Sequence, residues 1–122
     1  MWPYRDIEES VFESAKDLAE NVLSKLGAVK TVIPSNHIVR MCDQEGHVLL
    51  DRISHRPIWR YQNHYYRVDE VFFDSAPWIA LEFAESDLDA ADDAFAILEP
   101  FRYSLSEDEM KAAILDSIAD VS

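Results

Sequence analysis

The segment between Arg67 and Arg102 constrains the fold more than any other part of the sequence, because it contains no basic residue. It carries ten acidic residues, so residues 68–101 have a net charge of −10 in a chain whose total is −13. Carboxylates crowded in this way repel one another and destabilise a compact structure. The segment therefore indicates either a surface that faces water and keeps a small protein soluble, or a surface that meets a basic partner.

The aromatic residues favour the basic partner. Six of them are interleaved with the acids or come just before them: Tyr65, Tyr66, Phe72, Phe73, Trp78 and Phe83. Large aromatic side chains are the usual anchors of protein interfaces. Solubility alone does not require such anchors, so we expect this region to bind another protein.

Length and composition predict one globular domain over residues 1–122. The chain is long enough for a single hydrophobic core, and 48% hydrophobic residues with only two glycines are typical of a folded protein.

Its negative charge repels nucleic acids and anionic membranes, so we expect no direct contact with either. Without a membrane-spanning run or a signal peptide, and with Cys42 as the single cysteine, the sequence favours the reducing cytosol.

Residues 7–26 are predicted to form an amphipathic helix, which Asp6 can cap and Gly27 can end. Apolar residues recur three or four positions apart: Ile7, Val11, Ala15, Leu18, Val22 and Leu26. The charged residues expected off this stripe are Glu8, Glu13, Lys16, Asp17 and Glu20. A stripe of this width normally packs on the protein's own sheet, so we expect it in the core rather than on a partner.

About five mostly antiparallel strands are predicted in the middle of the chain. They lie among the segments 29–33, 37–41, 48–51, 58–61, 65–73 and 78–84. Asp43-Gln44-Glu45-Gly46 predicts a tight turn between the second and third segments, and Gln62-Asn63 predicts another between the fourth and fifth. In the last segment, side chains alternate, with Ile79, Leu81 and Phe83 on one face and Trp78, Ala80 and Glu82 on the other.

Two helices are predicted near the C-terminus. Ser86 begins the first, which continues to Leu98 and stops before Pro100. Ser106 and Glu109 form the capping box of the second. The whole pattern predicts an α+β fold, in which an N-terminal helix is followed by about five strands and then by two helices that pack on one sheet face.

No catalytic or metal-binding pattern is present. The four histidines, His37, His47, His55 and His64, are spaced ten, eight and nine residues apart, which matches no metal-ligand signature. Arg56 and Arg60 are better explained as ion-pair partners of neighbouring acids than as a phosphate-handling cluster. A lone cysteine is most often a small buried residue, and two glycines cannot build a phosphate-binding loop. We therefore expect no enzyme activity, no cofactor and no metal.

The stretch from YYRVDEVFF at residues 65–73, through Trp78 to Asp93 and on to EPFRYSLS at residues 99–106, resembles the small immunity proteins of bacterial polymorphic toxins. Contact-dependent growth inhibition systems provide the nearest likeness in size and acidity. The resemblance implies a cytosolic protein that binds the C-terminal domain of a toxin, often a nuclease, and blocks its active site or its access to substrate. A nuclease presents a positive groove to phosphates, and carboxylates can occupy such a groove.

The charge and aromatic patterns select the predicted partner-binding residues. The acidic residues are Asp69, Glu70, Asp74, Glu82, Asp87, Asp89, Asp92 and Asp93, and the anchors are Trp78, Tyr65 and Tyr66. This hypothesis requires the carboxylates to share one accessible surface with the aromatic anchors. The sequence favours a monomer without deciding the oligomeric state.

Two other functions remain open. One is an acidic type III secretion chaperone or adaptor, which would hold an extended effector segment along exposed apolar surface. The other is a phage-encoded inhibitor of a host nuclease, whose binding chemistry would be that of an immunity protein.

Overall fold

The computed structural model describes residues 9–35, 37–42, 45–53, 55–73, 76–102 and 104–121. In chain order its elements are α1 (Glu9–Lys25), β1 (Val29–Lys30), β2 (Ile38–Cys42), β3 (Val48–Ile53), β4 (Ile58–Tyr61), β5 (His64–Phe73), β6 (Ala76–Ala84), α2 (Asp87–Ala91), β7 (Ala96–Phe101) and α3 (Glu107–Ala119). A helix, a series of antiparallel strands and C-terminal helices confirm the predicted α+β class. Within the described residues, no helix is both long enough and apolar enough to cross a bilayer.

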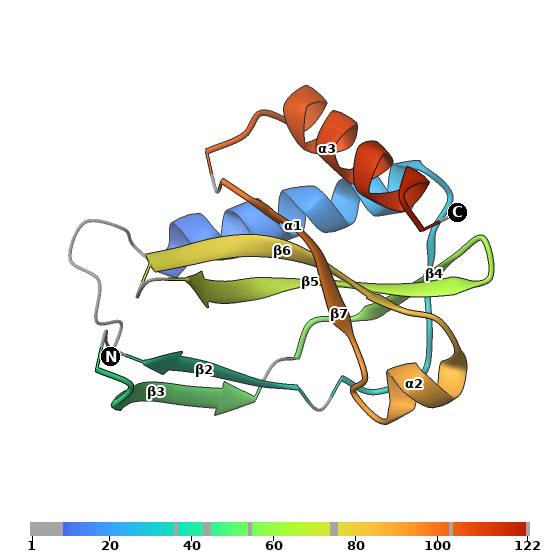
Figure 1. The fold of residues 1–122 in the computed structure, drawn as a ribbon. Coiled ribbons are helices and arrows are strands. Elements are labelled where there is room, and N and C mark those ends of the chain that lie inside the picture. Colours follow the sequence, from blue (N-terminus) through green and yellow to red (C-terminus); the bar gives the residue numbers. More distant parts are fainter. Residues whose placement is uncertain are drawn as a thin grey trace.

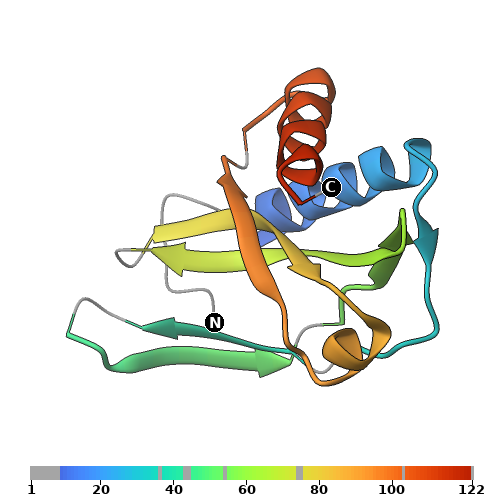
Figure 2. The same ribbon diagram turned by 45° about the vertical axis from the view of Figure 1, so that its right-hand side comes forward.

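The elements form three layers. Five strands make one antiparallel sheet in the order β1-β4-β5-β6-β7, and β2 pairs with β3 in a separate hairpin. Helices α1 and α3 lie over one face of the large sheet, whereas the β2–β3 hairpin and α2 lie on the opposite side (Figures 1 and 2). Strand β5 is therefore enclosed between α1 on one face and β2 on the other.

The main hydrophobic core lies between the large sheet and the helices α1 and α3. Its fully buried members include Phe12, Ala19, Leu23, Tyr66, Val68, Ile79, Leu81, Met110 and Ile114. Phe83 packs against this core beside Ile79 and Leu81, so the predicted alternation of β6 is confirmed. A smaller cluster of Ile58, Ala84 and Ala90 lies on the other face, where α2 packs.

Helix α1 packs on the sheet as predicted, but its buried face is only partly the predicted stripe. Ala15 and Val22 of that stripe are in the core and Leu26 packs against it, whereas Val11 is exposed and Phe12, Ala19 and Leu23 complete the buried face. Lys16 and Glu20, which were expected off the apolar stripe, are buried as well. The predicted Ile7 and the cap Asp6 lie outside the described residues. The helix thus carries charged side chains into the interior, where they need partners.

The predicted Gln62-Asn63 turn and the capping box of α3 are confirmed. In the other predicted turn Gly46 has a positive φ angle of 89°, while Asp43 and Gln44 lie outside the described residues. Gln62 and Asn63 both have positive φ angles, 50° and 67°, as a two-residue hairpin turn with the twist of its strands requires. Gly27, at φ 103°, follows α1. Ser106 Oγ accepts a hydrogen bond from the Glu109 N–H at 3.2 Å, and the Ser106 N–H donates to Glu109 Oε1 at 3.0 Å, which completes the capping box of α3.

The prediction for residues 86–98 is wrong in its extent. Ser86 does cap a helix, but α2 ends at Ala91 because Asp93 takes the left-handed conformation, with φ 57°. The chain then forms β7, which tolerates Pro100 because it is the last strand of the sheet and its outer edge needs no hydrogen-bond donor. Helix α2 also packs on the face opposite α3, so the two C-terminal helices do not share one sheet face.

Candidate partner-binding surface

Four of the predicted partner-binding residues are in the interior and cannot contact a partner. Asp69 and Glu70 are each 1% exposed, as is Tyr66, and Glu82 is 3% exposed. Tyr66 belongs to the main core. The prediction that these residues form a docking surface is therefore wrong. The three carboxylates instead belong to ion-pair clusters whose cations come from outside residues 68–101.

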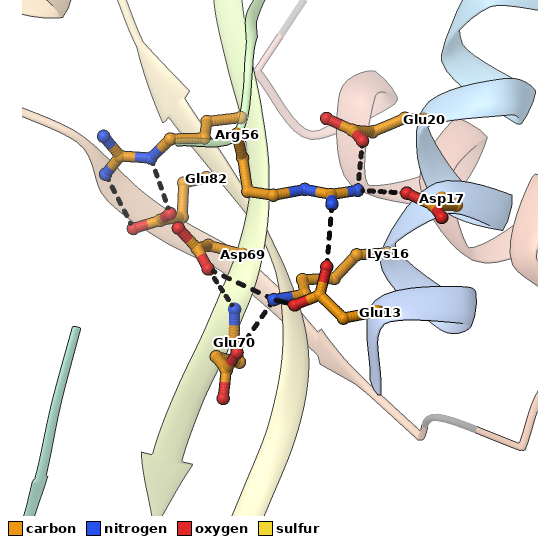
Figure 3. A network of polar contacts seen from close by, with 9 residues as sticks. Glu13, Lys16, Asp17, Glu20, Arg56, Asp69, Glu70 and Glu82 are labelled. Atoms are coloured by element: carbon orange, nitrogen blue, oxygen red, sulfur yellow. Dashed lines mark hydrogen bonds and ion pairs between the residues drawn. The ribbon is translucent and has the colours of Figure 1, made fainter. Parts of the chain in front are cut away.

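The first cluster surrounds Lys16, whose side chain is 1% exposed. Its Nζ lies 2.8 Å from Glu70 Oε1, 2.8 Å from Glu13 Oε1 and 4.0 Å from Asp69 Oδ1. The Glu70 backbone N–H also donates to Asp69 Oδ1 at 2.8 Å. In Figure 3 the Lys16 ammonium points from α1 toward these carboxylates of β5. A single buried ammonium thus holds two consecutive acids of the strand.

The second cluster joins Arg56 to the same helix (Figure 3). Arg56 contacts Glu13 at 3.2 Å and Asp17 at 2.8 Å, and it also pairs with Glu20. The Trp59 indole N–H donates to Glu20 Oε2 at 3.4 Å. Burial raises the pKa of the Glu20 carboxyl more than Arg56 and Trp59 lower it. Arg56, which was expected to offset neighbouring acids at the surface, instead connects the start of β4 to α1.

The third cluster surrounds Arg67 on the opposite face of β5. Its guanidinium donates to Glu82 from Nε at 3.0 Å and to Asp93 Oδ1 at 2.6 Å, and it stacks over the Phe95 ring at 4.1 Å. Its Nη1 also lies 3.2 Å from Ser35 Oγ. The register places Arg67 directly across from Glu82 on β6, so the two side chains share a face. Arg67 is 1% exposed, and its pairing therefore occurs away from water.

Asp93 connects this cluster to the segment before β2. Its second carboxylate oxygen lies 3.0 Å from His37 Nδ1, while the first accepts from Arg67. Burial opposes ionisation of the carboxyl, but the hydrogen bonds from Arg67 and His37 outweigh it and lower the pKa of Asp93. Asp93 is half-buried and already paired, so it is not one of the uncompensated charges of the surface.

The acids next to α2 are accessible to solvent, unlike the buried acids of β5 and β6. Asp87 and Asp92 are exposed and Asp89 is half-buried, as the partner-binding prediction requires. Glu85, which that prediction omitted, is exposed beside them, and Leu88 at their centre is 73% exposed. Within the described part of the chain, none of these four carboxylates forms an ion pair. We call Glu85, Asp87, Leu88, Asp89 and Asp92 the α2 acidic surface.

A groove adjoins the α2 acidic surface. It has a volume of about 730 Å³ and runs between the segment that contains β1 and the β4–β5 turn, with Asp87 at its border. Its lining includes the apolar residues Val29, Val32, Tyr61 and Tyr65 and also the cations Lys30 and Arg60. Tyr65 is half-buried and pairs with Ala84 just before α2, so this predicted anchor does lie near the acids. Apolar walls next to unneutralised carboxylates can hold a partner's side chain.

Trp78 is separated from this surface. It lies at the start of β6, whereas α2 follows the end of the same strand. Its ring is half-buried beneath the Arg102 guanidinium, whose Cζ is 5.2 Å from the ring centre. Trp78 is therefore at the opposite end of β6 from the α2 acidic surface, and its part in an interface with the α2 acids stays a prediction. Asp74, another predicted member, lies outside the described residues.

The described residues do not bring together three or more side chains that could hold a metal ion. His37 contacts Asp93, and His64 packs edge-on against Phe83 with 5.1 Å between ring centres. His47, on the other hairpin, lies 3.5 Å from Glu45. The histidines are therefore distributed over separate parts of the fold.

Known proteins give no further guidance about this surface. No protein-family model, no curated protein and no solved structure matches the chain. The likeness to toxin immunity proteins therefore remains a prediction, and what the surface can bind must be argued from its own residues.

Proposed function

We propose that this protein is a cytosolic immunity protein that binds and inhibits a basic toxin domain, a nuclease, through the α2 acidic surface. The observation that carries the proposal is the set of four carboxylates around Leu88 that no cation of the described chain neutralises. Carboxylates left in this state attract a cationic surface at long range. Leu88 and the adjoining groove supply the apolar contacts that a stable complex needs.

The internal ion pairs determine which carboxylates of the acidic segment remain available to a partner. Because Lys16 and Arg67 hold the buried acids of residues 68–101 in ion pairs, the described acids of that segment that stay accessible without an ion pair are those beside α2. A nuclease groove that binds phosphates offers the matching positive charge. Such complementarity mainly accelerates association and orients the partner, while the buried apolar contacts slow dissociation.

The test compares two variants that each lose three negative charges. The α2 variant carries Glu85→Gln, Asp87→Asn and Asp92→Asn. The control carries Asp108→Asn and Asp116→Asn on α3 and Asp120→Asn at its C-cap, where the acids are also exposed. The partner is the cationic C-terminal domain of a secreted protein encoded next to this gene, or a protein that co-purifies at low salt. Association rates are measured by stopped-flow fluorescence at low and physiological salt.

We expect the α2 variant to associate at least about tenfold more slowly than wild type at low salt, and the control to differ much less. We expect the wild-type rate to fall as salt rises. Equal rates for wild type and the α2 variant would show that the partner does not bind at α2. A wild-type rate that does not change with salt would remove electrostatic steering from the proposal.

A second function, an effector-binding secretion chaperone, is favoured by one specific observation. Ile38, Val48, Leu49 and Ile53 of the β2–β3 hairpin are all about half exposed, and they lie outside the acidic segment. A chaperone would hold an extended effector segment along such apolar side chains. In that case Ile38→Asp would weaken partner binding more than the α2 variant does.

A further inference from the structure

We propose that the β2–β3 hairpin is a contact surface for a second copy of this chain. The hairpin is a separate two-stranded sheet, and its strands have no other strand beside them in the described residues. A two-stranded ribbon has little stability alone and gains from packing on both faces. One side of the hairpin lies toward β5. The second copy would cover the other.

The register places the exposed side chains on one face. Ile38 lies across from Ile53, and Arg40 lies across from Asp51 two residues further along. The register shifts where Met41 pairs with Leu50 and Cys42 pairs with Val48, so Leu49 lies between them without a partner on β2. Ile38 is 54% exposed, Ile53 is 58% exposed and Leu49, at the shift, is 50% exposed. A pair of large apolar side chains exposed on one face, with a third exposed nearby, is typical of an interaction surface.

The charges of this face indicate that a second copy of the chain covers it, because they make the face complementary to an identical face. Arg40 and Asp51 form an ion pair with two hydrogen bonds, from Nε to Oδ1 and from Nη2 to Oδ2, each at 2.8 Å. A two-fold axis parallel to the strands, and between them, places β2 of one copy over β3 of the other. Arg40 then meets Asp51 of the second copy, and Ile38 meets its Ile53. An isologous interface requires this reciprocity.

The overall charge also favours this face over others. Two chains that each carry −13 repel one another, so they can approach only where that charge is weakest. The hairpin itself, residues 38–53, carries Arg40 and Arg52 against Asp43, Glu45 and Asp51, so its net charge is −1, whereas residues 68–101 carry −10. The exposed ion pair at the centre of the face adds no net charge. Added salt would therefore strengthen this contact by screening the repulsion, whereas it would weaken binding of a basic partner at α2.

Charge reversal tests the proposal with this chain alone. Four samples are compared by sedimentation equilibrium over a wide concentration range: wild type, Arg40→Asp, Asp51→Arg, and the double variant with both changes. Each single reversal places two like charges face to face at both symmetric positions of the dimer. We therefore expect the dissociation constant of the dimer to rise about tenfold. The double variant should dimerise like wild type. An equimolar mixture of the two single variants should form mixed dimers, because the opposite charges face each other again.

An apolar change provides a second test with a matched control. Ile38→Asp introduces charge into the proposed contact, whereas Val32→Asp makes a similar change at a fully exposed valine outside the hairpin. We expect Ile38→Asp to prevent dimer formation and Val32→Asp to leave it unchanged, with thermal unfolding showing that both variants fold. The proposal is overturned if wild type stays monomeric at every concentration. It is also overturned if the single reversals and Ile38→Asp dimerise like wild type.

Discussion

The acids of β5 and β6 and the acids beside α2 belong to one uninterrupted acidic segment, yet they have opposite environments. Asp69, Glu70 and Glu82 lie in the interior against Lys16 or Arg67. Glu85 and Asp92 face water without an ion-pair partner among the described residues. The comparison shows that a net charge counted along the chain does not measure surface charge. Cations from distant elements can neutralise one part of the segment and leave the next part free to bind.

The two regions should also differ in what they contribute to stability. A buried ion pair is expensive to desolvate, and removing one partner leaves a charge in the interior. An exposed carboxylate is already hydrated, so its removal costs little. Three variants test this difference, starting from the largest expected effect.

Lys16→Met should give the largest loss, about 4 kcal/mol in the free energy of unfolding, because Glu70 and Asp69 lose their buried ammonium. Urea denaturation measures the loss. Lys25→Met is the matched control, since Lys25 pairs with Glu107 at the surface, and it should cost less than about 0.5 kcal/mol. Adding Glu70→Met to Lys16→Met should recover part of the stability. If the two lysine variants are equally stable, the buried cluster has no structural role.

Asp93→Asn should give an intermediate loss of about 2 kcal/mol, because the ion pair with Arg67 is replaced by a hydrogen bond from the guanidinium to a neutral amide. The loss should depend on pH. The pKa of Asp93 is lowered in the folded protein, so the ionised carboxylate stabilises the fold fully above the unfolded pKa of about 4. That contribution disappears as the pH falls through the folded pKa. Urea curves for both proteins should therefore converge in acid. A constant difference at every pH would show that the charge of Asp93 does not contribute.

Glu85→Gln combined with Asp92→Asn should give the smallest effect, within about 0.5 kcal/mol of wild type. Both side chains are exposed, and Asp92 follows the C-terminal end of α2, where a negative charge is unfavourable. Thermal unfolding at low salt measures the change. A loss as large as that of Asp93→Asn would mean that these acids stabilise the fold and are not available to a partner.

Local signals predicted much of the fold correctly. The capping box of α3 and the Gln62-Asn63 turn depend on residues at most three positions apart, so the sequence shows all the participants. The segment 86–98 was harder, because its apolar residues fit a helix until Asp93 takes a left-handed conformation. Pairing with β6 then makes the rest a strand. A helical pattern alone does not reveal that competing strand.

The candidate site was predicted only in part, because contacts with distant parts of the chain decide which acids stay exposed. Asp87, Asp89 and Asp92 are where the charge pattern expected them, at or near the surface. Asp69 and Glu70 are not, because the cation that holds Glu70 comes from Lys16, 54 residues earlier. The positive balance of residues 37–67 was a signal that cations were available nearby. It did not show which acids they would reach.

The sequence by itself determined the α+β class, the hairpin turns, the helix caps and the excess of acid, because each follows from neighbouring residues or from composition. Only the tertiary structure decided which carboxylates stay exposed. Neutralisation requires a cation within a few ångströms, and strand register and helix orientation bring such groups together from distant parts of the chain. The surface available to a partner is therefore the charge that the fold leaves unpaired.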